Sequence, residues 1–181
     1  LLKDVGAKIK SWKFNPSYKK IHSKNNFKTE ADLRSHEIIF HGLLELFPGV
    51  EIISEENYND DIDRPEEYWL VDPIDGTSSW YHGYAGYVTQ AAFFYKSSPI
   101  FGIVYAPEYN NMWIGKQNQG ATINGERLNR LSHSERAIFV DNTETPHGII
   151  ENIMKTMDET SYMECGSIGL KSVLVADGSA D

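Results

Sequence analysis

The chain has a single cysteine, Cys165, among its 181 residues, so no disulfide can form within it and a reducing, cytoplasmic setting is expected. No apolar run approaches the roughly 20 residues that a membrane-spanning helix needs. Positive charge is also scarce, because 17 Lys and Arg stand against 26 Asp and Glu, a net charge of -9. Since neutralising nucleic-acid phosphates takes clustered basic side chains, we expect neither a nucleic acid polymer nor a membrane as partner.

What remains is an ordinary globular composition, with 40% hydrophobic and 24% charged residues and a length that suits one compact domain. The sequence contains no repeat and no low-complexity stretch. An acidic protein of this kind can still bind phosphorylated metabolites, provided that it recruits a cation to offset its own negative charge. Small phosphorylated ligands therefore stay open as substrates.

Two kinds of apolar pattern divide the chain. Four segments have the spacing of an amphipathic helix, and they are residues 1–12, 30–47, 149–157 and 167–176. Six shorter segments rich in β-branched and aromatic residues predict strands, and they are residues 50–53, 68–71, 88–95, 100–106, 112–115 and 137–141. Two helices, an antiparallel meander and then alternating strand and helix indicate an α+β fold class, with a loop over the polar residues 14–28.

Two acidic side chains follow the strand predicted over residues 68–71, since only Pro73 and Ile74 separate Asp72 from Asp75. In so tight a turn both carboxylates and the carbonyl of Ile74 can point to one spot. Two anions that close together repel strongly unless a cation lies between them. Hard oxygen donors without His or Cys suit Mg²⁺. The sequence thus predicts a Mg²⁺ site at this turn.

Further polar side chains are expected at the same place. Glu55 and Glu56 end the neighbouring predicted strand and can add a third carboxylate, while the Thr77 hydroxyl can orient an attacking water. Such a cluster can hold two or more Mg²⁺ ions. Each piece also has a structural explanation, because Asp-Gly pairs are common in turns and a Glu pair after a strand is usually solvated. Their occurrence together favours a site.

Residues 69–77, Trp-Leu-Val-Asp-Pro-Ile-Asp-Gly-Thr, preceded by Ile-Ser-Glu-Glu at 53–56, resemble the first signature of the inositol monophosphatase family. That superfamily also includes 3'(2'),5'-bisphosphate nucleotidases, fructose-1,6-bisphosphatases and inositol polyphosphate 1-phosphatases. The resemblance extends over nearly the whole chain. Further matching segments are residues 29–32, 102–105, 124–128, 166–167 and 175–181.

The resemblance implies a role for each matching residue. It implies that the metal ligands are Glu55, Asp72, the carbonyl of Ile74 and Asp75, and that the catalytic residues are Asp32, Glu55 and Thr77. It implies that the substrate-binding residues are Asp75, Gly76, Thr77, Gly166, Ser167 and Ile168. Asp32 and Thr77 would orient or activate the water, and the backbone of Gly76 and Thr77 would hold the phosphate at a helix N-terminus.

The resemblance also implies the layered α/β/α/β/α sandwich of sugar phosphatases, a homodimer, inhibition by Li⁺ and two or three Mg²⁺ ions. Residues 1–130 would form an N-terminal α+β subdomain with the metal site, and residues 131–181 the start of a C-terminal α/β subdomain. The family's second signature, Trp-Asp-x-Ala, is absent. We therefore expect the working protein to continue past Asp181 and to complete that C-terminal layer. The family's Asp-Ser-Pro pattern is also missing from residues 22–28, which leaves a family lysine and a third metal site unassigned.

Asp32 and Lys171 each have two interpretations. Thr29-x-x-Asp32 ahead of an apolar helix is also a capping-box pattern, in which Asp32 only satisfies amides at the helix end. The resemblance favours the catalytic role. Lys171 lies on the helix predicted after Ser167, where it is either a solvated surface lysine or a part of the site.

Four functions remain in competition. The leading one is Mg²⁺-dependent hydrolysis of a small phosphate monoester, an inositol monophosphate or a similar polyol phosphate, because residues 124–128 resemble that branch of the family. The alternative is a 3'(2'),5'-bisphosphate nucleotidase, which residues 105–107 and 169–171 resemble. A haloacid dehalogenase-type phosphatase is disfavoured, because its two Asp are two residues apart and these are three apart. A non-enzymatic binding protein is suggested only by the missing second signature.

Overall fold

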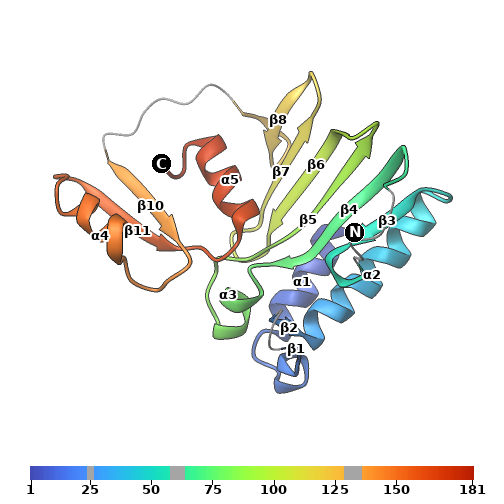
Figure 1. Ribbon diagram of the computed structural model, residues 1–181, viewed down its shortest axis with the longest axis horizontal. Helices are drawn as coiled ribbons and strands as arrows, with labels where there is room; N and C mark the ends of the chain where they lie inside the picture. Colours follow the sequence, from blue (N-terminus) through green and yellow to red (C-terminus); the bar gives the residue numbers. More distant parts are fainter. Residues whose placement is uncertain (24–26, 58–63, 129–135) are drawn as a thin grey trace.

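A computed structural model describes residues 1–23, 27–57, 64–128 and 136–181 of the chain. A seven-stranded sheet in the order β3-β4-β5-β6-β7-β8-β9 forms its centre (Figure 1). The strands are β3 (Glu51–Ser54), β4 (Glu67–Asp75), β5 (Val88–Tyr95), β6 (Ser98–Ala106), β7 (Asn111–Lys116), β8 (Gly120–Ile123) and β9 (Glu126–Arg127). β3 and β4 run parallel, and the remaining neighbours run antiparallel. The predicted meander over β5, β6 and β7 is therefore confirmed.

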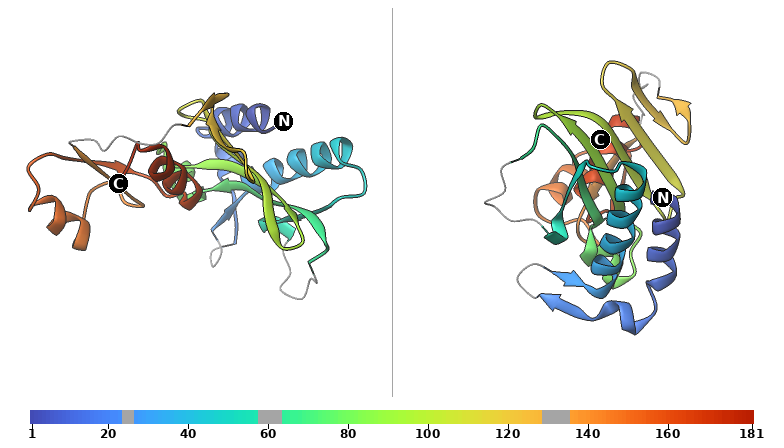
Figure 2. Two further views of the ribbon diagram at one scale, coloured as in Figure 1. Left: turned by 90° about the horizontal axis from the view of Figure 1, so that it is seen from above. Right: turned by 90° about the vertical axis from the view of Figure 1, so that its right-hand side faces the viewer.

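Two amphipathic helices, α1 (Leu2–Trp12) and α2 (Glu30–Leu46), cover one face of this sheet (Figure 2). Their apolar stripes form because Val5, Ile9 and Ile39 recur at helical spacing, and all three side chains are buried. The helices follow the prediction to within a residue or two at each end. Among the described residues, no helix is long and apolar enough to cross a membrane.

A third helix, α5 (Ile168–Asp177), covers the opposite face of the sheet. Because side chains alternate along a strand, Ile103 and Tyr105 of β6 pack with α1 and α2, whereas Val104 and Ala106 pack with Leu170 of α5. A parallel pair, β10 (Ala137–Asp141) and β11 (Thr160–Glu164), lies beyond α5 with α4 (Gly148–Met154) at its side (Figure 1). The layers are thus helix, sheet, helix, sheet and helix, as the family resemblance implies.

Several short elements were not predicted. The segment 14–28, predicted as a loop, contains a 3₁₀ turn (Pro16–Lys19) and the strands β1 (Ile21–Ser23) and β2 (Lys28–Thr29), while residues 24–26 lie outside the described part. The 3₁₀ turn is held by Tyr18, whose ring stacks on Trp12 at 4.4 Å between ring centroids. The prediction also omitted β8, β9, β11 and the helix α3 (Thr77–His82). Elements this short are stabilised by tertiary contacts, which the periodicity of apolar residues in the sequence does not predict.

A buried lysine joins α1 to two distant turns. The Nζ of Lys13 donates to the carbonyl of Tyr84 at 2.7 Å and to Oε1 of Glu108 at 2.8 Å. Lys13 is only 5% exposed. Glu108 also receives the hydroxyl of Tyr87 at 3.0 Å and pairs with Lys10 at 3.1 Å. Burial raises the pKa of Glu108, but the hydrogen bonds from Lys13, Lys10 and Tyr87 outweigh it and hold the pKa below its ordinary value.

We expect Glu108→Gln to lower the free energy of unfolding at neutral pH by about 2 kcal/mol, since it leaves a buried ammonium without its counter-charge. Because the folded-state pKa of Glu108 is depressed, its stabilisation is present above the unfolded pKa and is lost as the pH falls through the folded pKa. The difference from wild type should therefore shrink in acid. Urea unfolding followed by tryptophan fluorescence measures it, with exposed Glu126→Gln as control. A difference that does not change with pH would contradict the charge argument.

Candidate functional site

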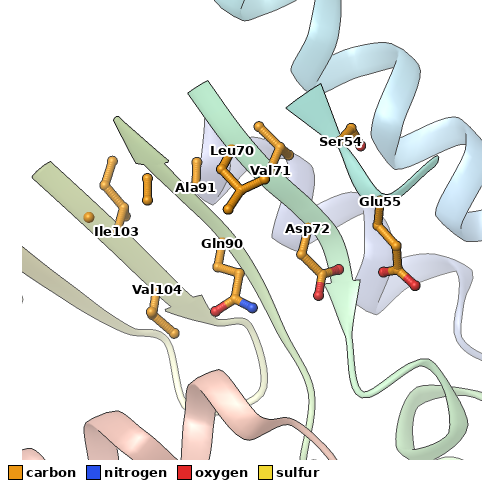
Figure 3. Close-up of a pocket in the computed structure, with 11 residues that line it drawn as sticks. Ser54, Glu55, Leu70, Val71, Asp72, Gln90, Ala91, Ile103 and Val104 are labelled. Carbon is orange, nitrogen blue, oxygen red and sulfur yellow. The ribbon is translucent and has the colours of Figure 1, made fainter. Parts of the chain in front are cut away.

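The carboxylates predicted to bind metal lie where two parallel strands end. β4 carries Asp72 and Asp75, and its pairing with β5 shifts register between these two residues, so the strand bends there. β3 pairs in parallel with β4, with Ser54 beside Val71, and Glu55 follows at the same edge. A cavity of about 530 Å³ lies beside these strand ends and is lined by Glu55 and Asp72 among others. The side chains of Glu55 and Asp72 point to the same side of it (Figure 3).

The environment of Asp72 calls for a cation. Burial, followed by the charges of Glu55 and Asp75 and a hydrogen bond with Glu55, raises the pKa of Asp72 to about 8. Its Oδ1 atom is buried without a hydrogen-bond partner. Within the described ranges, no group of three or more acidic, histidine or cysteine side chains is arranged so that it could hold a metal ion. An orphaned carboxylate oxygen among hard oxygen donors nevertheless fits Mg²⁺, which takes few protein ligands and keeps water and substrate oxygens as the others.

Asp32 and Thr77 meet although 45 residues separate them in the sequence. The Thr77 hydroxyl lies 2.9 Å from Oδ1 of Asp32 and 2.9 Å from the carbonyl oxygen of Ile74. The other oxygen of Asp32, Oδ2, accepts the backbone N–H of Thr29 at 2.8 Å and caps α2. The carboxylate thus makes the capping contact and the contact with Thr77 at once. Burial raises the pKa of Asp32 against the hydrogen bonds from Thr29 and Thr77 that lower it.

Asp75 is turned toward the start of α5. Its Oδ2 accepts the hydroxyl of Ser167 at 2.6 Å, the backbone N–H of Gly169 at 2.7 Å and the side-chain amide of Gln90 at 3.2 Å. A carboxylate at a helix N-terminus also interacts favourably with the helix dipole. Asp75 therefore joins the edge of the large sheet to the helix that covers it.

Two glycines allow the chain to approach itself closely at this point. Gly76 has a φ of +88°, and a Cβ there would lie 2.8 Å from the carbonyl oxygen of Gly86 and 3.0 Å from the backbone nitrogen of Ser167. Gly166 is equally crowded, by the hydroxyl of Ser79. Ile168, by contrast, is 68% exposed. The residues predicted to bind substrate thus lie on two helix starts that face each other across the end of β4.

The second glutamate of the pair has a partner of its own. The Nζ of Lys28 lies 2.6 Å from Oε2 of Glu56, whose side chain is 3% exposed. Residues 24–26, in the segment 22–28 that lacks the family's Asp-Ser-Pro pattern, lie outside the described residues. The third metal site stays a prediction.

Sequence reasoning missed Gln90 and Gly169, which complete the surroundings of Asp75. A signal was available for Gln90, because a polar residue interrupts the apolar face of the strand at that position. No local signal marked Gly169. Its backbone N–H becomes important only because α5 docks on β5.

Comparison with curated proteins finds relatives with different names. The chain is 30% identical over 176 residues to a 3'(2'),5'-bisphosphate nucleotidase CysQ of Buchnera aphidicola, covering 92% of this chain and 63% of the relative. It is 28% identical over 167 residues to inositol monophosphatase 1 of Bos taurus, covering 84% and 60%. A putative Nus factor SuhB of Neisseria meningitidis is 32% identical over 104 residues, covering 58% and 40%. The matches thus span 40–63% of the lengths of these three relatives.

Solved structures share the fold. The Thermotoga maritima IMPase matches with a TM-score of 0.76 and 25% identity, over 99% of this chain and 71% of that one. An IMPase/NADP phosphatase that was crystallised with Mg²⁺ and phosphate matches with a TM-score of 0.68 and 25% identity, over 88% and 61%. Finally, a sequence profile described as "Inositol monophosphatase family" matches residues 2–181. The chain therefore belongs to the inositol monophosphatase family.

Proposed function

We propose that this chain carries the catalytic centre of a Mg²⁺-dependent phosphomonoesterase that hydrolyses a small phosphorylated metabolite with a metal-activated water. The observation that carries the proposal is the hydrogen bond between Thr77 and Asp32, made at the end of the strand that carries the orphaned Oδ1 of Asp72. A proton acceptor and a cation-binding carboxylate at one strand end are what hydrolysis of a phosphate ester requires.

The residues that would hold Mg²⁺ are Glu55, Asp72, the carbonyl oxygen of Ile74 and Asp75. When bound, Mg²⁺ lowers the pKa of water and offsets the charge that develops on the phosphate oxygens. Two or three ions suit the family. The raised pKa of Asp72 supports this assignment, because a carboxylate beside Glu55 and Asp75 is most stable as an anion when a cation is present.

Thr77 and Asp32 would move the proton of the nucleophilic water. A threonine hydroxyl that donates to Asp32 keeps its lone pairs free to accept a hydrogen from water. Because burial raises the pKa of Asp32, its carboxylate is a stronger base than an exposed aspartate. Thr29 fixes the other oxygen of Asp32, so the side chain stays aimed at Thr77.

The backbone at Gly76 and Thr77 would hold the phosphate, and Gly166, Ser167 and Ile168 would contact the rest of the substrate. We favour an inositol monophosphate or a similar polyol phosphate, turned over by a cytoplasmic homodimer. Inositol monophosphatase 1 of Bos taurus, 28% identical, supports this choice.

A bisphosphate nucleotide is the second candidate substrate, and Lys171 favours it. This lysine lies one turn after Ser167 on α5, where its Nζ is 3.8 Å from Oδ1 of Asp141 and its side chain is only 23% exposed. An ammonium on the helix whose start binds Asp75 suits a second phosphate group. The CysQ of Buchnera aphidicola, 30% identical, agrees with it.

Asp75→Asn should abolish Mg²⁺-dependent phosphatase activity, lowering kcat/KM by roughly a hundredfold or more while the protein stays folded. The amide removes the charge but keeps the size of the side chain. Activity against a phosphate monoester over a Mg²⁺ titration, with circular dichroism as the folding check, measures the effect. Exposed Asp4→Asn serves as the matched control. Unchanged activity in Asp75→Asn would remove the basis of the metal site.

Asp72→Asn should stabilise the metal-free protein by about 2 kcal/mol at pH 8, because it removes a buried charge and its repulsion with Glu55 and Asp75. It should also abolish the stabilisation that Mg²⁺ gives to wild type, since a ligand that binds only the folded state raises Tm. Thermal unfolding with EDTA and with saturating MgCl₂ measures both effects. If the variant gains as much from Mg²⁺ as wild type does, Asp72 is not a ligand.

The two substrate classes are separated by comparing the turnover of inositol 1-phosphate with that of adenosine 3',5'-bisphosphate. We expect the higher kcat/KM for inositol 1-phosphate, and little change of it in Lys171→Met. A preference for the bisphosphate that falls at least about tenfold in Lys171→Met, through a raised KM, would select the nucleotidase instead.

A further inference from the structure

Gln90 is the polar side chain that β5 directs toward α5. It lies directly across from Asp72 in the antiparallel pairing of β4 with β5, so the two side chains share one face of the sheet. Figure 3 shows both pointing toward the α5 side, where they line the same cavity. Its neighbour on this face, Val88, is fully buried in the cluster around α5. A glutamine beside this buried cluster needs hydrogen-bond partners for its side-chain amide.

The Gln90 amide finds a partner in Asp75 across the bend of β4. Its Nε2 atom donates to Oδ2 of Asp75 at 3.2 Å, and the shorter bonds from Ser167 and Gly169 reach the same oxygen. Every hydrogen bond found from the described residues to the Asp75 side chain therefore ends on Oδ2. This arrangement leaves Oδ1 for another ligand.

The residue of α5 that faces Gln90 is a glycine. A Cβ on Gly169 would lie 2.1 Å from Oε1 of Gln90 and 3.0 Å from Oδ2 of Asp75. The φ of Gly169 is not positive, so the backbone would accept any residue there. A Cβ at 169 would instead push the end of the flexible Gln90 side chain out of its present place and would crowd Oδ2 of Asp75.

We propose that Gln90 is a positioning residue for metal binding, and that Gly169 is the matching small residue that lets it work. Gln90 holds Oδ2 of Asp75 against the start of α5, so that Oδ1 is presented to Mg²⁺. The inference rests on the proposed function, since it assigns a task to a neighbour of the metal ligands. Groups that orient ligating carboxylates by hydrogen bonds affect metal affinity without touching the metal.

The first test is Gln90→Met, which keeps the length of the side chain and removes the amide. Mn²⁺, as a probe for Mg²⁺, is titrated into the metal-free full chain by calorimetry and by the loss of its free electron paramagnetic resonance signal. We expect Mn²⁺ affinity to fall about tenfold or more. We also expect the Mg²⁺ concentration for half-maximal phosphatase activity to rise by a similar factor, with kcat at saturating Mg²⁺ close to wild type.

The second test is Gly169→Ala. Helix propensity and the geometry of the site predict different effects of this substitution on Mn²⁺ affinity. Alanine favours a helix over glycine, so a purely structural role predicts a higher Tm and unchanged Mn²⁺ affinity. The clash with Gln90 predicts weaker Mn²⁺ binding instead. Gly115→Ala is the control, because a Cβ there meets nothing within 4 Å. In a Gln90→Ala background only the 3.0 Å contact of the Cβ with Oδ2 of Asp75 remains, so Gly169→Ala should cost less affinity there than in wild type.

The outcomes separate this inference from the proposed function. If wild type binds Mn²⁺ and Gln90→Met binds it equally well with an unchanged Tm, Gln90 does not position Asp75. A Gly169→Ala loss that persists in full in the Gln90→Ala background also overturns the pairing. If the wild-type chain itself binds no Mn²⁺, the proposed metal site fails, and this inference fails with it.

Discussion

Like-charge repulsion at the end of the parallel pair β3 and β4 is the constraint on which the rest of this structure depends. Parallel strands bring their carboxyl ends to one edge, so Glu55, Asp72 and Asp75 gather there. Burial, and after it the charges of Glu55 and Asp75, raise the pKa of Asp72 to about 8 where no cation offsets them. The surrounding sheet keeps the carboxylates from moving apart.

The helix α5 relieves the repulsion in part, and in doing so it joins the layers of the fold. Oδ2 of Asp75 accepts hydrogen bonds from donors at the start of α5 and on β5. The backbone nitrogen of Ser167 donates to the carbonyl of Gly86 at 2.9 Å, beside Gly76, where no side chain would fit. The contact between sheet and α5 and the orientation of Asp75 are therefore a single structural feature.

Asp32 shows how one side chain can make a capping contact and a contact with a distant residue at once. The pattern Thr29-x-x-Asp32 predicted either a helix cap or a catalytic carboxylate. A carboxylate has two oxygens, and here one caps α2 while the other meets Thr77. The cap holds the side chain in place, which is what a group that accepts a proton from a positioned hydroxyl needs. The helix cap thus fixes the carboxylate that meets Thr77 at the end of a distant strand.

The sequence by itself determined α1, α2, the strands β3 to β7 and the family, because apolar periodicity and the run from Trp69 to Thr77 are local properties. Tertiary structure decided what depends on residues far apart in the chain. Lys13 pairs with Glu108, and Gln90 faces Gly169, only because helices dock on the sheet, whose pairing of β4 with β5 shifts register between Asp72 and Asp75. A side chain's neighbours across 79 or 95 residues follow from packing and strand register, which a pattern of neighbouring residues does not encode.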